Sequence, residues 1–144
     1  MKLTETLKAA FEKQITLEFQ ASLAYRQFAI DMDAQDLPGM ASWLRRQADE
    51  EIVHANKFID HVLDRGSRPV IGAIDAQVPA HDPTPLTVFQ AARAHEEKVS
   101  ASVRELYKAA EAEGDLDARP LLNWFIEEQI EEEATVSEIV ATIE

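Results

Sequence analysis

The sequence predicts an all-α protein, a bundle of four long helices with one long crossover between the second and the third. Four long segments carry apolar residues at alternating three- and four-residue steps, the period of a helix with one inward face. Prolines stand at the starts of three segments, where a first-turn proline is tolerated. Two connections are short and the middle one is long, which is one of the known topologies of such bundles.

The first helix is predicted from about Thr4 to Asp33 and the second from about Pro38 to Arg65. Each has an inward stripe that is mostly apolar. In the first helix the stripe contains Leu7, Phe11, Ala21, Tyr25, Phe28 and Met32, and in the second it contains Met40, Leu44, Phe58 and Val62.

The third helix is predicted to begin near Pro85 and the fourth near Pro120. Gly66 and Gly114 follow the expected ends of the second and third helices, a position that glycine favours. The stripes continue with Leu86, Phe89, Val99, Val103, Leu106 and Ala110 in the third helix and Leu122, Phe125, Val136 and Ile139 in the fourth.

The connections determine the topology. The first and third, at about 34–37 and 113–119, are short, so each joins antiparallel neighbours. The connection 66–84 can span more than the roughly 40 Å length of a helix, because an extended chain covers roughly 3.3 Å per residue. It therefore returns the chain to the same end and makes the second and third helices parallel. Its residues Val70, Ile71, Ile74 and Val78 imply packing against the bundle or a partner.

Length and composition indicate one domain over residues 1–144. The chain has no cysteine, which excludes disulfides, thiolate zinc sites and iron–sulfur clusters. No stretch approaches the roughly 20 apolar residues of a membrane span, and the N-terminus lacks a signal-peptide core. A soluble cytoplasmic protein is expected. The net charge of −13 argues against binding a nucleic-acid backbone.

Polar residues interrupt all four apolar stripes near the middle of each helix. Burying this many carboxylates in one layer costs several kcal/mol per ion unless their pKa values rise or cations lie among them. Carboxylates with one imidazole suit iron or manganese better than copper. The interrupting residues are Glu18, Glu51, His54, Glu96, Gln129 and Glu132.

Any one of these residues could be a partly exposed edge residue. Polar residues that interrupt the apolar stripes of all four helices at the same depth, however, favour a metal site. Tyr25, two turns after Glu18 on the same face, either packs or hydrogen-bonds a metal-bound carboxylate. The tryptophans Trp43 and Trp124 are expected to pack. The remaining histidines, His61, His81 and His95, are expected at the surface rather than as ligands.

The segments LEFQASLAY, DEEIVHANKFIDHVLDRG, HEEKVSASVREL and WFIEEQIEEE resemble those of the bacterial non-haem ferritins, and the likeness covers nearly the whole chain. The resemblance implies a ferritin-like fold and a ferroxidase that oxidises Fe(II) with oxygen or hydrogen peroxide. It also implies storage of ferric mineral inside a 24-subunit shell. The apolar crossover around Val70, Ile71 and Ile74 is well placed to hold two-fold dimers, so at least a stable dimer is expected.

By this resemblance two irons bind in each subunit. Glu18, Glu51 and His54 hold the first iron, and Glu51 with Glu96 holds the second. Gln129 lines the second site and contacts bound oxygen.

The resemblance assigns two further roles. Tyr25 hydrogen-bonds a ligand and supplies an electron. A third, weaker iron site is formed by Glu50, Glu128, Glu131 and Glu132.

Related families differ at named positions. Bacterioferritins and rubrerythrin-like proteins repeat the Glu-x-x-His pair in the fourth helix, where this chain has Gln129 and Glu132. Ile52 stands where bacterioferritins have a haem-binding methionine, so no haem is expected. Mini-ferritins build their site between subunits, whereas all the ligands expected here lie in one chain.

The resembling family usually continues past the fourth helix into a short fifth helix at the four-fold channel, whereas this sequence stops at Glu144. We expect the difference to affect that channel and not the ligands. Two other functions stay open: a di-iron peroxidase that removes hydrogen peroxide without storing mineral, and a non-enzymatic helical interaction module with an acidic face. The module would not explain the polar layer.

Overall fold

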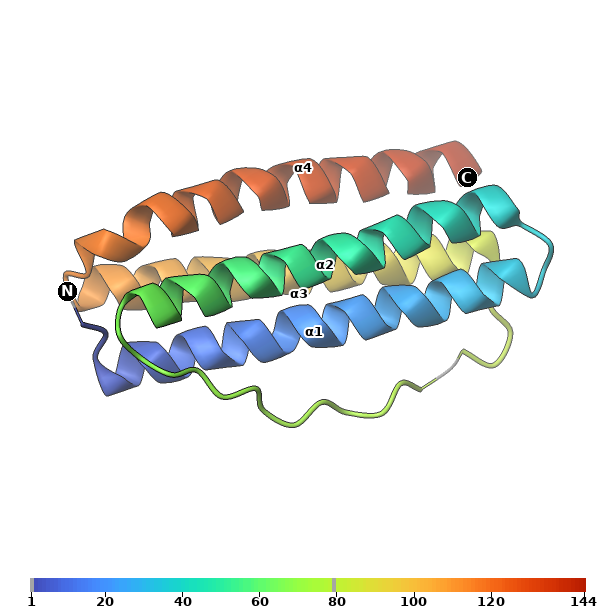
Figure 1. Cartoon of the computed structure of the whole chain (residues 1–144). Coiled ribbons are helices and arrows are strands. Elements are labelled where there is room, and N and C mark those ends of the chain that lie inside the picture. Colours follow the sequence, from blue (N-terminus) through green and yellow to red (C-terminus); the bar gives the residue numbers. More distant parts are fainter. Residues whose placement is uncertain (1, 79) are drawn as a thin grey trace.

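The computed structural model describes residues 2–78 and 80–144 and confirms the predicted four-helix bundle (Figure 1). The helices are α1 (Glu5–Asp33), α2 (Pro38–Asp64), α3 (Pro85–Ala112) and α4 (Arg119–Ile143). A short 3₁₀ helix, η1 (Leu116–Ala118), lies between α3 and α4. The helix boundaries agree with the prediction to within one or two residues.

Local sequence signals determine where the helices begin and end. Thr84 caps α3, because its hydroxyl accepts from the backbone N–H of Thr87 while the Thr87 hydroxyl accepts from the N–H of Thr84. Gly66 and Gly114 follow α2 and α3 with φ values of 78° and 64°, the left-handed conformation that ends a helix.

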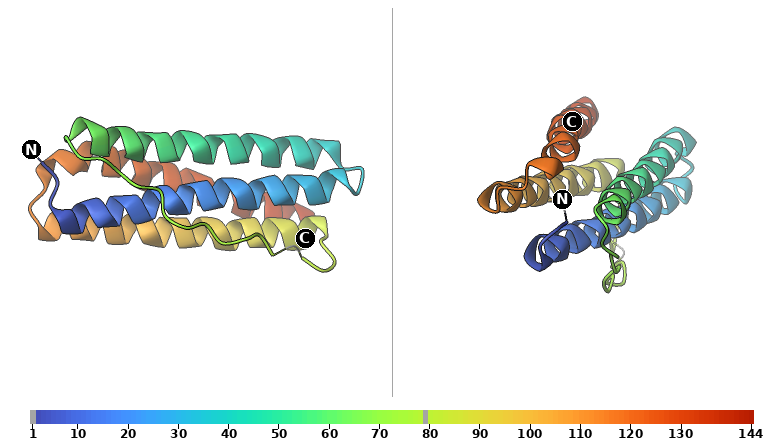
Figure 2. Two further views of the ribbon diagram at one scale, coloured as in Figure 1. Left: turned by 60° about the horizontal axis from the view of Figure 1, so that its bottom comes forward. Right: turned by 60° about the vertical axis from the view of Figure 1, so that its left-hand side comes forward.

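The crossover makes α2 and α3 parallel, as predicted, and runs along α1 from one end of the bundle to the other (Figures 1 and 2). Two backbone N–H groups attach it to α1. Val70 donates to Glu12 Oε2 at 2.7 Å, and Gly72 donates to Thr16 Oγ1 at 2.8 Å. A Cβ on Gly72 would lie 3.3 Å from Thr16 Oγ1, so this close approach favours glycine.

The apolar side chains of the crossover stay largely outside the core. Val70 and Ile71 are each 51% exposed and Val78 is 91% exposed. The sequence predicted that the crossover packs either against the bundle or against a partner. The backbone of the crossover packs against the bundle, whereas the side chains of Val70, Ile71 and Val78 remain available to a partner.

The hydrophobic core consists of two clusters, one toward each end of the bundle. The first includes Leu7, Phe11, Phe58, Val103, Leu122 and Phe125. The second includes Tyr25, Met32, Leu44, Phe89, Val136 and Val140.

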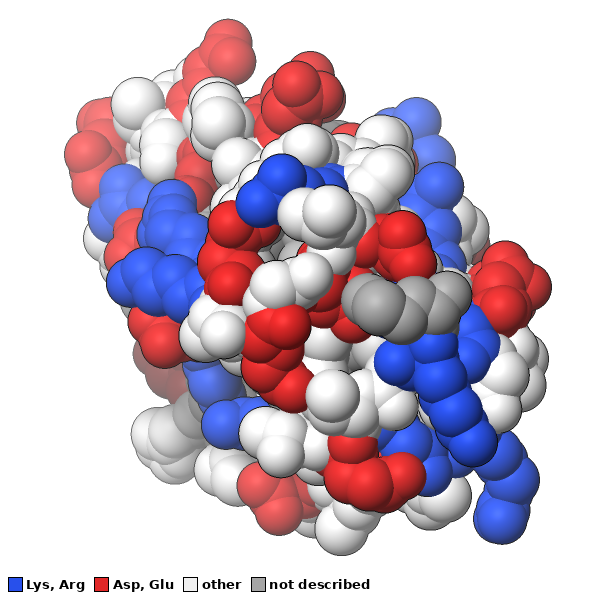
Figure 3. Space-filling view, turned by 90° about the vertical axis from the view of Figure 1, so that its left-hand side faces the viewer, with Lys and Arg blue, Asp and Glu red and all other residues white. Residues whose placement is uncertain are grey.

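A buried ion pair closes the end where α2 finishes and α4 begins. Arg65 Nη2 donates to Asp115 Oδ2 at 2.6 Å, and Asp115 Oδ1 accepts from the backbone N–H of Ala118 at 3.1 Å. Viewed onto this end, acidic and basic side chains are mixed over the surface (Figure 3). Within the described residues, no helix is long and apolar enough to cross a membrane.

Candidate metal centre

The six predicted polar residues all lie in the interior, between the two apolar clusters. The helical period places one or two of them on the inward face of each helix. Their exposed fractions are 0% for Glu18 and Glu96, 1% for Glu51, 3% for His54 and Gln129, and 8% for Glu132.

Glu18, Glu51 and His54 form one group of potential ligands. Each offers one ligand atom, and the three atoms lie within 4.8 Å of one another. His54 Nδ1 is 3.2 Å from Glu51 Oε2 and 3.8 Å from Glu18 Oε2. Glu51 and His54 come together because residues three apart are neighbours on a helix surface. The group has the size and donor chemistry of a site for one divalent ion.

Glu51 also belongs to a second group, with Glu96 and Glu132, whose ligand atoms again lie within 4.8 Å of one another. Tyr25 from α1 donates its hydroxyl proton to Glu96 Oε1 at 2.7 Å, and Gln129 Nε2 donates to Glu96 Oε2 at 3.2 Å. Glu51 is therefore placed between two potential ion positions, and Tyr25 and Gln129 orient the carboxylate of the second.

Burial raises the pKa of three carboxyl groups in the layer, those of Glu51, Glu96 and Glu132. It raises the pKa of Glu96 to about 8 and that of Glu132 to about 9, and neighbouring carboxylates add to both shifts. The pKa of Glu51 also rises, chiefly through burial. Burial alone would lower the pKa of His54, but Glu18 and Glu51 raise it to about 11. The metal-free layer therefore holds protons at neutral pH that cations would displace.

Two side-chain oxygens in this layer have no hydrogen-bond partner among residues 2–78 and 80–144. They are Glu18 Oε2 and Gln129 Oε1, both out of contact with solvent. A buried acceptor without a partner costs free energy, and a cation bound by oxygen would satisfy it. The donor set and the two unsatisfied oxygens thus fit a hard divalent metal such as Fe(II).

Two buried glutamines support the acidic residues but were not predicted as part of the site. Gln14 Nε2 donates to Glu18 Oε1 at 3.1 Å. Gln47 Nε2 donates to Glu51 Oε1 at 2.9 Å and to Glu132 Oε2 at 2.7 Å. Each glutamine precedes its glutamate by four residues, and that spacing was the available sequence signal.

The residues of the predicted third iron site are only partly gathered. Glu128 and Glu132 form a group with His54, with ligand atoms within 4.8 Å. Glu50 and Glu131 are exposed and are not members of that group.

The structure also tests the predictions for the two tryptophans and for two of the remaining histidines. Trp43 packs against Phe89, and Trp124, though 36% exposed, lies edge-on to His54. His81 is exposed as predicted. His95, which was predicted at the surface, is instead partly buried with its ring edge-on to Tyr25. The rotation of α3 that buries Glu96 also draws in this neighbouring residue.

The amino-acid sequence of this chain is similar to those of known proteins. Residues 8–144 match the family described as "Ferritin-like domain". The chain is 36% identical to a bacterial non-heme ferritin of Bacteroides fragilis, over 98% of this chain and 88% of that protein. It is 34% identical to a probable bacterial non-heme ferritin-like protein of Haemophilus influenzae, over 96% of this chain and 83% of the relative.

Solved structures give the same picture. The chain superposes on a crystal structure of an open pore ferritin from Archaeoglobus fulgidus with a TM-score of 0.94. That match has 33% sequence identity and covers 98% of this chain and 85% of the other. A ferritin of Chlorobium tepidum gives a TM-score of 0.92 at 27% identity, over 96% of this chain and 84% of that one.

Proposed function

The chain belongs to the ferritin family, and on this premise we propose that it is an iron-storage ferroxidase. Two Fe(II) ions bind inside each subunit, are oxidised to Fe(III), and pass into a ferric mineral held within a protein shell. The observation that carries the proposal is the buried polar layer, where two groups of ligand atoms share Glu51.

The chemistry expected of this layer follows from its residues. Glu18, Glu51 and His54 would bind the first Fe(II), and Glu51, Glu96 and Glu132 the second. Each iron loses one electron, so a pair can reduce dioxygen to hydrogen peroxide, or hydrogen peroxide to water, with uptake of two protons. Burial excludes bulk water from the ions and strengthens their attraction to the carboxylates.

Two neighbouring side chains are assigned supporting roles. Tyr25 holds Glu96 through its hydroxyl and is close enough to supply an electron. Gln129 Oε1, buried without a partner in the described part of the chain, would be available to contact the oxidant at the second iron. A third, weaker iron position would use Glu128 and Glu132, with the exposed Glu50 and Glu131 able to turn toward it.

We propose further that the subunits assemble into a 24-subunit shell through a dimer. Exposed apolar residues on one side of the bundle support self-association, including Leu23 and Ile30 on α1 and Val70 and Ile71 on the crossover. Both α1 and the crossover run the length of the bundle, side by side (Figure 2).

Aerobic loading of the metal-free protein with Fe(II) tests the function. The initial rate of ferric absorbance, the molar mass by light scattering, and the iron retained per chain would be measured together. Fast oxidation by a large shell that retains many irons per chain supports storage. A small oligomer with about two irons per chain would instead support the peroxidase alternative.

Substitution tests the location. Glu51→Gln should slow the oxidation strongly, while Glu97→Gln, an exposed neighbour of a ligand, should not. Anomalous diffraction from iron-soaked crystals should place two irons in the polar layer. Iron found only between chains, with that layer empty, would refute the proposal.

A further inference from the structure

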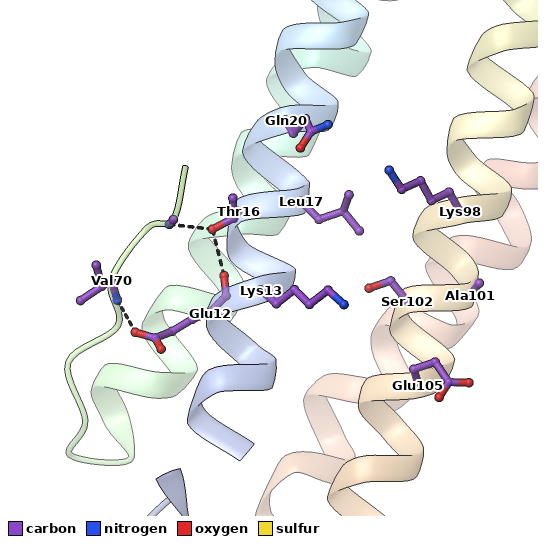
Figure 4. Close-up of a pocket in the computed structure, with 11 residues that line it drawn as sticks. Glu12, Lys13, Thr16, Leu17, Gln20, Val70, Lys98, Ala101, Ser102 and Glu105 are labelled. Carbon is purple, nitrogen blue, oxygen red and sulfur yellow. Dashed lines mark hydrogen bonds between the residues drawn. The ribbon is translucent and has the colours of Figure 1, made fainter. Parts of the chain in front are cut away.

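A pair of hydrogen-bonded side chains connects the outside of the bundle to the candidate metal centre. Ser102 of α3 donates its hydroxyl proton to Gln14 Oε1 at 2.5 Å, and Gln14 Nε2 donates to Glu18 Oε1 at 3.1 Å. Ser102 lies on the wall of a groove of about 710 Å³ between α1, α3 and the crossover, with its hydroxyl directed toward α1 (Figure 4). The pair thus links two helices to one predicted iron ligand.

The two oxygens of Glu18 have different surroundings as a result. Oε1 accepts the amide proton of Gln14, whereas Oε2 finds no partner among the described residues. Oε2 is also the oxygen nearer to His54, 3.8 Å from Nδ1. One oxygen is therefore anchored to Gln14, and the other faces His54, on the side where the first iron would bind.

The burial of Gln14 indicates that its hydrogen bond to Glu18 has a specific role. Gln14 lies on the same inward stripe as Leu7 and Phe11 and is only 1% exposed, so an apolar residue would fit the core pattern better. Its amide is tolerated because both ends are hydrogen-bonded. Glu18 Oε1 accepts the hydrogen bond from Gln14, so the NH₂ group of Gln14 faces Glu18 and its oxygen faces Ser102.

We propose that Gln14, held in place by Ser102, is a positioning residue that presents Glu18 Oε2 to the first iron. The inference rests on the proposed function, because it assigns Glu18 as a ligand. Residues that hydrogen-bond to metal ligands fix ligand orientation, and their loss commonly costs about 10- to 100-fold in metal affinity.

Anaerobic titration of the metal-free full-length protein with Co(II) tests this without depending on iron oxidation. Co(II) serves as the probe because its visible absorption bands respond to the number and arrangement of ligands. Gln14→Met preserves side-chain volume and removes both hydrogen bonds. The affinity for the Co(II) ion bound through Glu18 should fall about tenfold or more, with a changed absorption spectrum.

Three further variants separate positioning from packing. Ser102→Ala should weaken the same Co(II) ion by a smaller factor, and Ser102→Thr, which keeps the hydroxyl, should restore wild-type behaviour. Gln27→Met is the matched control, because Gln27 donates to Asp31 with the same spacing on the same helix. It should leave both Co(II) ions unaffected.

The outcomes distinguish the two proposals. Wild-type affinity and spectrum in Gln14→Met would overturn the positioning role while leaving the iron site intact. A lower melting temperature of the metal-free variant with unchanged Co(II) binding would show a purely structural role and overturn it as well. Failure of the wild type to bind Co(II) in the polar layer would refute the proposed function together with this inference.

Discussion

Replacing Glu96 by glutamine should stabilise the metal-free protein, although it removes a predicted ligand. Burial raises the pKa of this carboxyl group from 4.5 to about 8, so at pH 7 the folded protein holds a proton that the unfolded chain has released. The 2.5 pH units between 4.5 and 7 correspond to about 3 kcal/mol, by which deprotonation of the unfolded chain lowers the stability of the wild type at pH 7. Glutamine does not titrate, so the variant avoids this loss.

The expected pH dependence has a definite sign. Because the folded state binds more protons between pH 4.5 and about 8, wild-type stability falls as the pH rises through this interval. The advantage of Glu96→Gln should be near zero at pH 4.5, about 3 kcal/mol at pH 7, and about 5 kcal/mol above pH 8.

The hydrogen bonds can adapt to the substitution. A glutamine oxygen at position 96 can still accept from Tyr25, and Gln129 Nε2 keeps the backbone oxygen of residue 96 and Ser100 Oγ as acceptors. Neither Tyr25 nor Gln129 is therefore left without a hydrogen-bond partner.

The effect is measured by denaturant unfolding of the protein after a chelator has removed bound metal. Circular dichroism monitors the unfolding at several pH values. Glu97→Gln is the control, because that side chain is 60% exposed and its replacement should change stability by less than about 0.5 kcal/mol at any pH. A Glu96→Gln variant that is less stable than the wild type at pH 7, or equally shifted at every pH, would refute the reasoning.

The structure supports three further predictions. Glu51→Ala should abolish binding of both Zn(II) ions in equilibrium dialysis, whereas Glu18→Ala should keep one, because only Glu51 belongs to both ligand groups. Arg65→Met should destabilise the protein by about 3 kcal/mol in denaturant unfolding, since it leaves Asp115 buried without its cation. Burial alone would raise the pKa of Asp115, but Arg65 lowers it, so this loss should diminish as the pH falls below the unfolded value of 3.8. Binding of Zn(II) at pH 7 should release protons, because the pKa of Glu96 lies near 8. Calorimetry in buffers of different ionisation enthalpy should detect these protons. Binding heats that do not depend on the buffer would contradict this prediction.

Much of the fold was predictable because local signals and periodicity agree. The apolar period gave four helices, and Gly66 and Gly114 marked two helix ends that the structure confirms. The crossover followed from chain length alone, since only an extended connection could reach the far end of α2. The exposure of Val70 and Val78 was not predictable, because an apolar residue in a loop gives no sign of whether its own chain covers it.

The site was predictable to the extent that it breaks the helical pattern. A glutamate on an apolar stripe, as at Glu18 or Glu96, is conspicuous in the sequence, and the structure buries both. The link between Ser102 and Gln14 was not visible, because the residues lie 88 positions apart and their contact depends on how α1 and α3 are rotated. Rotation also explains the partial burial of His95, which no periodicity argument applied to α3 alone had indicated.

The separation of the core into two apolar clusters has a consequence for the way the metal-free chain opens. In an ordinary helical bundle, hydrogen exchange is fastest at the frayed helix ends and slowest in the middle. Here both ends carry an apolar cluster, and the middle holds protonated carboxyl groups and oxygens without partners. We expect the central turns to lose amide protection first in the metal-free state, and bound iron to reverse that order by joining all four helices at their weakest level.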